Sequence, residues 1–390
     1  MWIILVITAV LVVAHIALTW RAAIVSGQVA RNRTDETSTA PPSTADMPKV
    51  SVLIPAWKEY GTLEHCIHSL DKVTYPNWEC IIVAGGPDDT FTYAQGLAAD
   101  RPHFKAVEQP PKGKNAALNL GFGQANGEII VVLDADSRVE PDWLTHLISP
   151  FAHGAEATTG NFHPERQTPV SMVGEMEKII GYEVYGGATL QGSGSIALKR
   201  EIIDAMGGFH EGIVVGVDWD LNLRVEQGGY QRAFAPGATV YTERPATVGE
   251  FWKNEVRWRR AHLWLLYGHR AWFTRSIPAM LGAALFYVVT LAATGGLLLT
   301  LLAALVGAGE VALFFAGMTA LFLLWSTLRR AALAGQVAAY KDDQSWLRYG
   351  STVALLLLLA MLATWRAVLT LHKKTPHFKG PRVLTESRAQ

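Results

Sequence analysis

The order of apolar and polar positions divides the chain into a middle part with short apolar runs and two ends with long ones. In the middle part, runs that suit buried strands alternate with segments whose apolar residues recur at helical spacing. We expect strands at Val50 to Ile54, where Pro55 ends the run, at Trp78 to Ala84, at Ala106 and Val107 and at Ile129 to Leu133, and helices at Glu59 to Leu70, Phe91 to Ala99 and Lys114 to Ala125. This alternation predicts an α/β domain with a largely parallel sheet and right-handed crossovers.

The N-terminal end, residues 1–21, is predicted to be a membrane anchor. Met1 to Trp20 is apolar and long enough to cross a bilayer of roughly 30 Å, and it lacks both a basic leading region and a small-residue cleavage site. Arg21 and Arg31 follow it, and by the positive-inside rule they place the next segment in the cytoplasm. Residues 22–47 are rich in Thr, Ser, Ala and Pro and predict a flexible tether.

The C-terminal part predicts three further spans within residues 276–371. Pro278 to Gly309 carries no charge and suits one tilted helix, with a kink at Gly295 and Gly296, while Glu310 to Leu328 and Tyr349 to Trp365 suit two more. Three spans after a cytoplasmic domain leave the tail, residues 372–390, outside. Basic residues in that tail favour the inside, and the sequence leaves both interpretations open.

Residues 251–275, ahead of these spans, combine aromatic and basic side chains. Phe251, Trp258, Leu265 and Trp272 recur on one face, while Lys and Arg occupy other positions. A helix of this composition is expected to lie in the membrane–water interface. A basic amphipathic helix in water is the alternative, and the apolar segments that follow favour the membrane.

Composition supports a soluble domain, residues 48–250, joined to membrane helices. Half of the residues are hydrophobic, 17% are charged and the mean hydropathy is +0.17. Basic and acidic residues balance, so the net charge points to no polyanionic partner and we expect no nucleic-acid binding. The two cysteines, Cys66 and Cys80, lack metal-type spacing and are expected to be buried small hydrophobic residues.

Two aspartates directly follow the last predicted strand. Asp134 and Asp136 end the run from Ile129 to Leu133, and ligands of open α/β sheets bind beyond the carboxyl ends of the strands. Carboxylates two residues apart can face one point, and they suit Mg²⁺ or Mn²⁺ together with phosphate oxygens. An acidic turn is the alternative. A dinucleotide fold is not indicated, because Pro55 to Glu59 stands where its glycine-rich loop would be.

Six segments, in one order along the chain, resemble the membrane-bound family 2 glycosyltransferases, which include chitin, hyaluronan and cellulose synthases and ceramide glucosyltransferases. They are Val50-Ser-Val-Leu-Ile-Pro-Ala-Trp-Lys-Glu59, Lys112-Gly-Lys-Asn-Ala-Ala-Leu-Asn-Leu-Gly121, Asp134-Ala-Asp136, Gln191-Gly-Ser-Gly-Ser-Ile-Ala-Leu-Lys-Arg200 ahead of Gly207-Gly-Phe209, Asp218-Trp-Asp-Leu-Asn-Leu-Arg224 and Asn254-Glu-Val-Arg-Trp258. The resemblance covers about Lys49 to Arg260 and the arrangement of one N-terminal and several C-terminal spans. It implies a GT-A fold, with a Rossmann-like and mostly parallel sheet.

The resemblance also implies a role for each matching residue. Asp134 and Asp136 would bind Mg²⁺ or Mn²⁺, and Asp218, with Asp220 as the alternative, would be the base that deprotonates the acceptor hydroxyl. Arg257 and Trp258 complete the implied catalytic set, and Trp258 either stacks on an acceptor sugar or anchors the interfacial helix. The implied substrate contacts are Pro55, Glu59, Asp88, Lys114, Asp134, Ser195, Asp220 and Asn254. Without the resemblance, Lys114 is equally well a solvated lysine at a helix start.

Three departures from the family pattern affect these roles. Gly85 and Gly86 stand where adjacent acids are usual, and Asp88 follows slightly later, which puts recognition of the nucleotide base through an acid in doubt. Gly216-Val217 replaces the Thr-Glu that usually precedes the base. Asn254 replaces a Gln.

The sequence therefore predicts an inverting, metal-dependent glycosyltransferase in the inner membrane, with its catalytic domain in the cytoplasm. Its donor would be a nucleotide sugar, with UDP as the expected nucleotide, and its acceptor a membrane lipid or a growing polysaccharide. A polyprenyl-phosphate sugar synthase and a catalytically silent polysaccharide-binding or export subunit are the alternatives. Four spans are few for a one-subunit channel unless the protein forms a homo-oligomer or the interfacial helix contributes. This favours a glycolipid or short-chain product over a long polymer.

Overall fold

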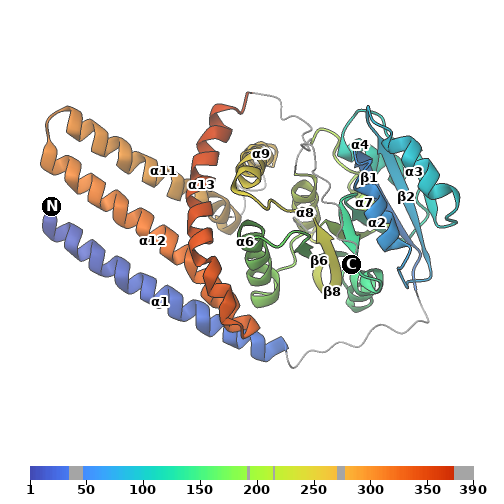
Figure 1. The fold of residues 1–390 in the computed structure, drawn as a ribbon, viewed down its shortest axis with the longest axis horizontal. Helices are drawn as coiled ribbons and strands as arrows, with labels where there is room; N and C mark the ends of the chain where they lie inside the picture. The colour runs from blue at the N-terminus through green and yellow to red at the C-terminus, as the bar shows by residue number, and fades with distance from the viewer. Residues whose placement is uncertain (35–46, 191–193, 214–215, 270–276, 373–390) are drawn as a thin grey trace. The chain divides into compact units, whose positions relative to one another are not determined.

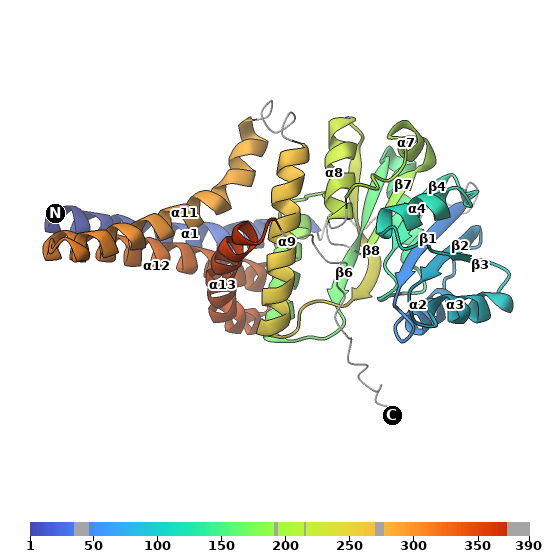
Figure 2. The same cartoon turned by 90° about the horizontal axis from the view of Figure 1, so that it is seen from above.

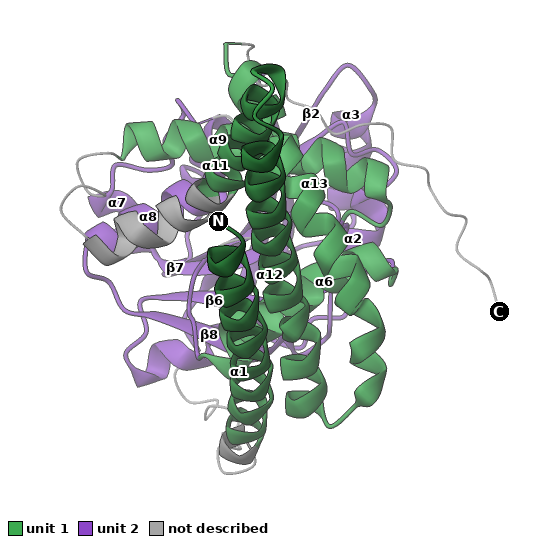
Figure 3. Cartoon of the chain, turned by 90° about the vertical axis from the view of Figure 1, so that its left-hand side faces the viewer, with its two compact units in different colours: residues 1–38, 167–185, 245–373 green, residues 39–166, 186–244, 374–390 purple. Residues whose placement is uncertain are grey.

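The computed structural model describes residues 1–34, 47–190, 194–213, 216–269 and 277–372. The chain divides into two compact units, which Figure 3 colours separately. Unit 1 comprises residues 1–38, 167–185 and 245–373, and unit 2 comprises residues 39–166, 186–244 and 374–390. The expected domain of residues 48–250 is thus interrupted, because residues 167–185 belong to unit 1.

Unit 2 is built on an eight-stranded sheet of order β3-β2-β1-β4-β7-β6-β8-β5 (Figures 1 and 2). The strands are β1 Val50–Trp57, β2 Trp78–Gly85, β3 Phe104–Glu108, β4 Ile129–Leu133, β5 Ser137–Val139, β6 Ala157–Pro164, β7 Ser195–Lys199 and β8 Arg232–Thr242. The pairs β1–β2, β1–β4, β2–β3 and β6–β8 are parallel, and β4–β7, β6–β7 and β5–β8 are antiparallel. The sheet is therefore mixed, and the predicted parallel arrangement holds for β1 to β4.

Helices cover both faces of this sheet. One face packs against α2 Leu63–Leu70, α3 Thr90–Ala99 and α5 Trp143–Ile148, and the other packs against α4 Lys114–Phe122, α7 Arg200–Ala205 and α8 Val217–Gln227. A short 3₁₀ helix, η2 Ser149–His153, follows α5. In β4, Ile129, Val131 and Leu133 join the first core, while Ile130 and Val132 join the second. This alternation explains the continuous apolar run, and full burial of each such side chain stabilises the fold by about 1.5–3 kcal/mol.

Several predicted element boundaries differ from the structure, and two of the differences bear on the site. Strand β1 continues past Pro55 to Trp57, because beyond Leu53 it pairs only with β2 and leaves its other edge unpaired, where a proline is tolerated. Helix α2 begins at Leu63 and not at Glu59. The backbone N–H of Glu59 instead donates to Thr90 Oγ1 at 3.0 Å, at the start of α3.

Unit 1 is helical in its described part. Its elements are α1 Trp2–Thr34, α6 Pro169–Lys178, the π-helical turn η3 Ile179–Val184, α9 Val248–Gly268, α11 Ile277–Leu305, α12 Gly309–Lys341, the 3₁₀ helix η4 Gln344–Tyr349 and α13 Gly350–Leu369. Its core joins Met176 and Ile179 from α6 and η3 to Val337 of α12 and Leu356 of α13. This packing explains why residues 167–185, although they lie between β6 and β7 in sequence, belong to unit 1.

Helices α1 and α12 pack side by side and run in the same direction. The indole N–H of Trp20 donates to the Leu328 carbonyl at 3.1 Å, Gln336 donates to Ser26 Oγ at 2.8 Å, and Arg31 pairs with Asp342 at 2.7 Å. These contacts explain why residues 22–34, expected as part of a flexible tether, continue α1 as a helix. The remaining tether residues, 35–46, lie outside the described residues.

Three helical segments of the described chain are long and apolar enough to cross a membrane: Trp2–Arg31, Gly309–Lys341 and Gln344–Leu369. The described part of α11 adds a shorter apolar segment, Thr290–Leu305. Helix α11 is continuous through Gly295 and Gly296, where a kink is predicted. A Cβ on Gly296 would lie 2.1 Å from Thr319 Oγ1, so this glycine permits a close approach between α11 and α12.

Candidate active site

The two aspartates predicted to bind metal follow the end of β4 in a tight turn. The Ser137 N–H donates to the Asp134 carbonyl at 3.0 Å, and the Asp134 N–H donates to the Gly194 carbonyl at 3.1 Å. Gly194 has φ +65°, and a Cβ there would lie 3.0 Å from Ser137 Oγ. Glycine therefore lets the segment before β7 lie against the turn that carries Asp134 and Asp136.

Lys114 lies at the start of α4 and forms an ion pair with Asp134. Burial alone would lower the pKa of Lys114, but the carboxylates of Asp134, Asp218 and Asp136 outweigh it and the pKa is raised. The structure thus brings four of the predicted site residues into one electrostatic group. The sequence alone left open whether Lys114 is simply a solvated lysine. In the fold, Lys114 is a cation close to three carboxylates.

Two asparagines of α4, which the sequence motif contains but to which we assigned no role, hold the loop ahead of α8. Asn115 Nδ2 donates to the His210 carbonyl at 2.6 Å. Asn119 Nδ2 donates to the Phe209 carbonyl at 2.9 Å, and Asn119 Oδ1 accepts from the Phe209 N–H at 2.7 Å. Gly208, with φ +85°, has no room for a Cβ, which would lie 2.8 Å from Asn119 Oδ1. Because α8 begins shortly after this loop, α4 helps to position both Lys114 and Asp218.

The two candidates for the base differ in environment. Asp218 lies half-buried in the first turn of α8. Asp220 is 4% exposed, and its carboxylate lies 3.7 Å from Arg224, one turn further along the same helix. A buried carboxylate beside an arginine suits a structural ion pair, whereas Asp218 shares its surroundings with Lys114. The geometry therefore favours Asp218, as the sequence motif did.

Cys66 lies beneath the metal-site turn. Its thiol lies 3.9 Å from the Asp134 carbonyl oxygen, and both cysteines are buried and unbridged, as predicted. Burial raises the pKa of the Cys66 thiol, and the nearby carboxylates of Asp136, Asp134 and Glu59 raise it further. A thiol held in its neutral form is a poor metal ligand and nucleophile, so Cys66 has a packing role.

The residues predicted to contact the nucleotide base gather around the ends of β1 and β2. Asp88 Oδ1 accepts from Thr90 Oγ1 at 2.7 Å, so its carboxylate helps to fix the start of α3. Glu59 is 3% exposed, and its carboxylate accepts from Thr62 Oγ1 at 2.5 Å. Gly85 has no room for a side chain, because a Cβ would lie 2.6 Å from the Gln109 carbonyl. The missing acid at this position thus has a steric reason, namely the approach of β3.

Ser195, predicted to contact substrate, lies at the start of β7 with no exposed surface. Its hydroxyl accepts a hydrogen bond from the Trp143 indole N–H at 3.0 Å. This buried contact joins β7 to α5 and gives Ser195 a role in packing, while its contact with substrate stays a prediction. Gln191 to Ser193, from the same motif, lie outside the described residues.

The remaining predicted residues lie together on α9 in unit 1. Arg257 Nη2 donates to Asn254 Oδ1 at 2.9 Å, one helical turn away. Trp258, the next residue, is 39% exposed. The shorter amide of Asn254 therefore still reaches Arg257. Trp272, predicted on the same helix, lies outside the described residues.

Carboxylate chemistry at the turn fits a hard divalent cation. The ammonium group of Lys114 already lies against Asp134, which shows that this carboxylate can be reached by a cation. Within the described ranges, no three His, Cys, Asp or Glu side chains converge as a ready-made metal site. Two carboxylates would therefore leave most coordination positions to water and diphosphate oxygens, which is the usual mode for Mg²⁺.

Comparisons with known proteins agree with this arrangement. Residues 51–202 match the model of glycosyl transferase family 2, and residues 129–368 match that of glycosyl transferase family group 2. Because the second match covers more than half of the chain, the protein belongs to the family 2 glycosyltransferases and is a glycosyltransferase enzyme.

Individual relatives are more distant. The chain is 28% identical over 261 residues to the probable glycosyltransferase YdaM of Bacillus subtilis, a match that covers 62% of each protein. It is 28% identical over 226 residues to the poly-beta-1,6-N-acetyl-D-glucosamine synthase of Staphylococcus aureus, which covers 54% of this chain and 53% of that one. The matches thus span between half and two thirds of these relatives' lengths.

Among solved structures, the mannosyltransferase PcManGT from Pyrobaculum calidifontis, in complex with GDP-Man and Mn²⁺, matches with a TM-score of 0.59 at 18% identity. The match covers 92% of this chain and 99% of that one. At this identity the likeness concerns the fold, and the predicted GT-A fold is confirmed.

Proposed function

We propose that the protein is an inverting, metal-dependent glycosyltransferase that moves a sugar from a UDP-sugar to a saccharide or lipid acceptor at the inner membrane. The observation that carries this proposal is the grouping of Lys114 with Asp134, Asp136 and Asp218 around the end of β4. Donor phosphates need cations, and an acceptor hydroxyl needs a base. This group offers both at the carboxyl end of a central parallel strand.

The reaction forms a bond from the acceptor oxygen to the anomeric carbon and breaks the bond from that carbon to the diphosphate. Asp218 takes the proton from the attacking hydroxyl. Lys114 lies beside the leaving diphosphate and counters its growing negative charge. A bound Mg²⁺ or Mn²⁺, held by Asp134 and Asp136, would supply further neutralisation of that charge. Attack from the face opposite the diphosphate inverts the anomeric configuration.

Helix α9 carries the remaining residues of the family motif. The resemblance assigns Arg257, which binds Asn254, to the diphosphate, and the exposed Trp258 offers an aromatic surface to an acceptor sugar or to the membrane interface. Trp264 and Tyr267 on the same helix are 51% and 64% exposed. These exposed aromatic side chains suit a helix that lies in the membrane–water interface.

Parallel packing of α1 and α12 supports a cytoplasmic location for the catalytic residues. Arg21 and Arg31 belong to the same end of the pair as Arg330 and Lys341. By the positive-inside rule this end is cytoplasmic, and the chain enters unit 2 from it. Nucleotide sugars are found in the same compartment.

Poly-beta-1,6-N-acetyl-D-glucosamine synthase among the relatives favours a polysaccharide acceptor and makes UDP-N-acetylglucosamine the first donor to test. The purified full-length protein would be incubated with UDP-N-acetylglucosamine, UDP-glucose, UDP-galactose and GDP-mannose, with Mg²⁺, Mn²⁺ or EDTA. We expect metal-dependent release of UDP from one UDP-sugar and a labelled lipid or polymer product. Release only from GDP-mannose would contradict the choice of nucleotide.

A labelled polyprenyl phosphate as the sole product would favour a polyprenyl-phosphate sugar synthase. No turnover of any donor, with nucleotide binding retained, would favour a silent polysaccharide-binding subunit. The ion pair of Lys114 and Asp134 and the half-buried Asp218 weigh against the silent alternative.

A further inference from the structure

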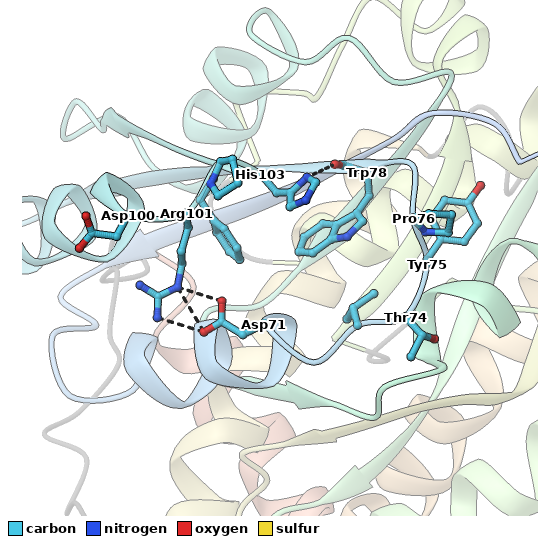
Figure 4. A pocket seen from close by; sticks show the side chains of 11 residues that line it. Asp71, Thr74, Tyr75, Pro76, Trp78, Asp100, Arg101 and His103 are labelled. Atoms are coloured by element: carbon cyan, nitrogen blue, oxygen red, sulfur yellow. Dashed lines mark hydrogen bonds and ion pairs between the residues drawn. The ribbon is translucent and has the colours of Figure 1, made fainter.

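A cavity of about 300 Å³ opens in unit 2 where strands β2 and β3 begin, at the end of the sheet opposite to the metal-site aspartates. One wall is the loop after α2, residues 71–76, and the other is the turn that leads into β3, residues 100–104 (Figure 4). Trp78 and Phe104 begin the parallel strands β2 and β3, whereas Asp134 and Asp136 follow the carboxyl end of β4, which runs in the same direction. The cavity is therefore separate from the candidate active site.

The floor of the cavity is aromatic, and its rings contact one another. The Trp78 and His103 rings stack with their centroids 5.7 Å apart and their planes 11° apart, and the Phe104 ring meets Trp78 edge-on at 5.5 Å. His103 Nδ1 lies 3.2 Å from the Trp78 carbonyl, and because a carbonyl oxygen only accepts, Nδ1 carries the proton. In the neutral ring, Nε2 is then an acceptor.

Three polar groups of the cavity make no hydrogen bond with any described residue: the Trp78 indole N–H, His103 Nε2 and the Asp100 carboxylate. Trp78 is only 7% exposed, and its ring lies at the cavity in Figure 4, so its N–H is a donor without a described protein partner that a ligand could satisfy. By contrast, Arg101 is fully engaged, since it binds both carboxylate oxygens of Asp71, at 2.9 Å and 3.0 Å, and the Leu97 carbonyl at 2.7 Å.

These groups select the chemistry of a ligand. A phosphate or carboxylate could accept from the indole N–H but would face the Asp100 carboxylate with Arg101 already neutralised. An amine could donate to Asp100 but could not accept from the indole. A sugar hydroxyl can do both, and the apolar face of a sugar ring matches an aromatic floor. The volume lies at the lower end of the range of roughly 300–1,000 Å³ for ligand pockets and suits one or two sugar rings.

We infer that this cavity, floored by Trp78 and His103, is a second saccharide-binding site, remote from the metal site. Trp78 donates to a ring or hydroxyl oxygen, while Asp100 and His103 Nε2 accept from hydroxyls. The site goes beyond the proposed transfer reaction, because it needs neither donor nor metal. Under the proposed function it would hold a part of the acceptor or product away from the catalytic aspartates.

The test is a binding titration with the full-length protein in detergent, carrying Asp136→Ala so that transfer and metal binding do not contribute. Chitobiose and cellobiose are the probes, and saturation-transfer NMR detects their binding. Inorganic phosphate and UDP are the controls. We expect one or both disaccharides to bind without metal, without competition by UDP and without binding of phosphate. Trp78→Phe, which keeps a ring but loses the N–H, should weaken binding about 2- to 10-fold, as expected for one neutral hydrogen bond.

Trp264→Phe, a tryptophan exposed on α9, is the matched control and should leave the affinity unchanged. Asp100→Ala is a second variant of the same site. Asp100 is exposed, so its replacement should not disturb folding, and it should also weaken disaccharide binding about 2- to 10-fold. Absence of disaccharide binding, equal affinity in Asp100→Ala and the control, or displacement of the sugar by UDP would each overturn the second site. Because this test measures disaccharide binding, a protein without transfer activity could still bind the sugar. Failure of the second site and failure of the proposed transferase function are therefore distinguishable.

Discussion

At the scale of single residues, the candidate site depends on a balance of charge around Lys114. Burial opposes its charge, yet three carboxylates raise its pKa, so the ammonium group remains charged through the neutral range. The same balance separates Asp218, whose carboxylate helps to raise the pKa of Lys114, from Asp220, which is buried beside Arg224. Two substitutions test these assignments.

Asp136→Ala should abolish sugar transfer while the protein still folds, because Asp136 is expected to bind a metal ion and not to stabilise the core. UDP release with and without EDTA measures the effect, and the thermal unfolding midpoint controls for folding. Transfer that persists in EDTA or in this variant would contradict the metal assignment.

Asp218→Asn should leave donor binding nearly unchanged and reduce turnover by about 10²- to 10⁴-fold, the usual cost of losing a general base. Single-turnover kinetics and a UDP-sugar binding titration separate the two effects. The control is Asp220→Asn, which removes a charge from the ion pair with Arg224 and should affect stability more than chemistry. An inactive Asp220→Asn beside an active Asp218→Asn would reverse the assignment.

At the scale of elements, helices fix the site through contacts between distant parts of the chain. Helix α4 carries Lys114 and, through Asn115 and Asn119, holds the loop that leads into α8. In unit 1, the hydroxyl of Tyr287 on α11 lies 2.7 Å from His262 Nδ1 on α9, so the helix that carries Arg257 is tied to α11.

Asn119→Ala should lower both stability and turnover, because it leaves the Phe209 N–H and carbonyl without their partner. We expect a loss of about 1–3 kcal/mol in the free energy of unfolding, measured by denaturant unfolding. Turnover should fall further than donor binding, since the loop leads to Asp218. The exposed Gln95 on α3 provides a control, and Gln95→Ala should change neither quantity.

His262 predicts a loss of stability in acid. Burial, and then Arg259, lowers the pKa of His262 to about 3 in the folded protein. The unfolded chain therefore binds a proton below about pH 6.5 that the folded protein does not, and stability falls as pH falls, by about 2 kcal/mol at pH 5. Unfolding midpoints of wild type and His262→Gln between pH 7 and pH 5 measure this. Identical pH dependence in the two proteins would show that His262 does not titrate in this way.

At the scale of the whole molecule, the chain combines an α/β sheet unit with a helical unit that contains the candidate membrane spans. The sequence between β6 and β7 belongs to the helical unit through a buried ionic cluster. Lys178 Nζ lies 2.9 Å from Glu175 and 3.6 Å from Glu183, and Glu183 binds Lys341 of α12 at 2.8 Å. The segment of residues 167–185 is thus held to α12 within unit 1.

The parallel pair of α1 and α12 predicts which side of the membrane each end faces. A cysteine at Ser38, past the basic end of α1, should be labelled by an impermeant maleimide only in inverted membranes, and Glu310→Cys, at the start of α12, only in intact cells. Native Cys66 and Cys80 are buried and provide an unreactive background. Labelling of Ser38→Cys from outside intact cells would reverse the orientation and the compartment of the acceptor.

The sequence by itself determined the features that depend on local pattern. The apolar run of β4, the aspartates at its end and the long apolar helices follow from burial and periodicity, which neighbouring residues specify. Tertiary structure alone decided the features that depend on pairing between distant segments. These include the antiparallel pairing of β4 with β7, the ion pair of Lys114 with Asp134, the burial of Ser195, the assignment of residues 167–185 to unit 1 and the cavity at Trp78. The physical reason is that a side chain's partner, and with it the side chain's charge and accessibility, is set by strand order and helix packing, which local periodicity does not encode.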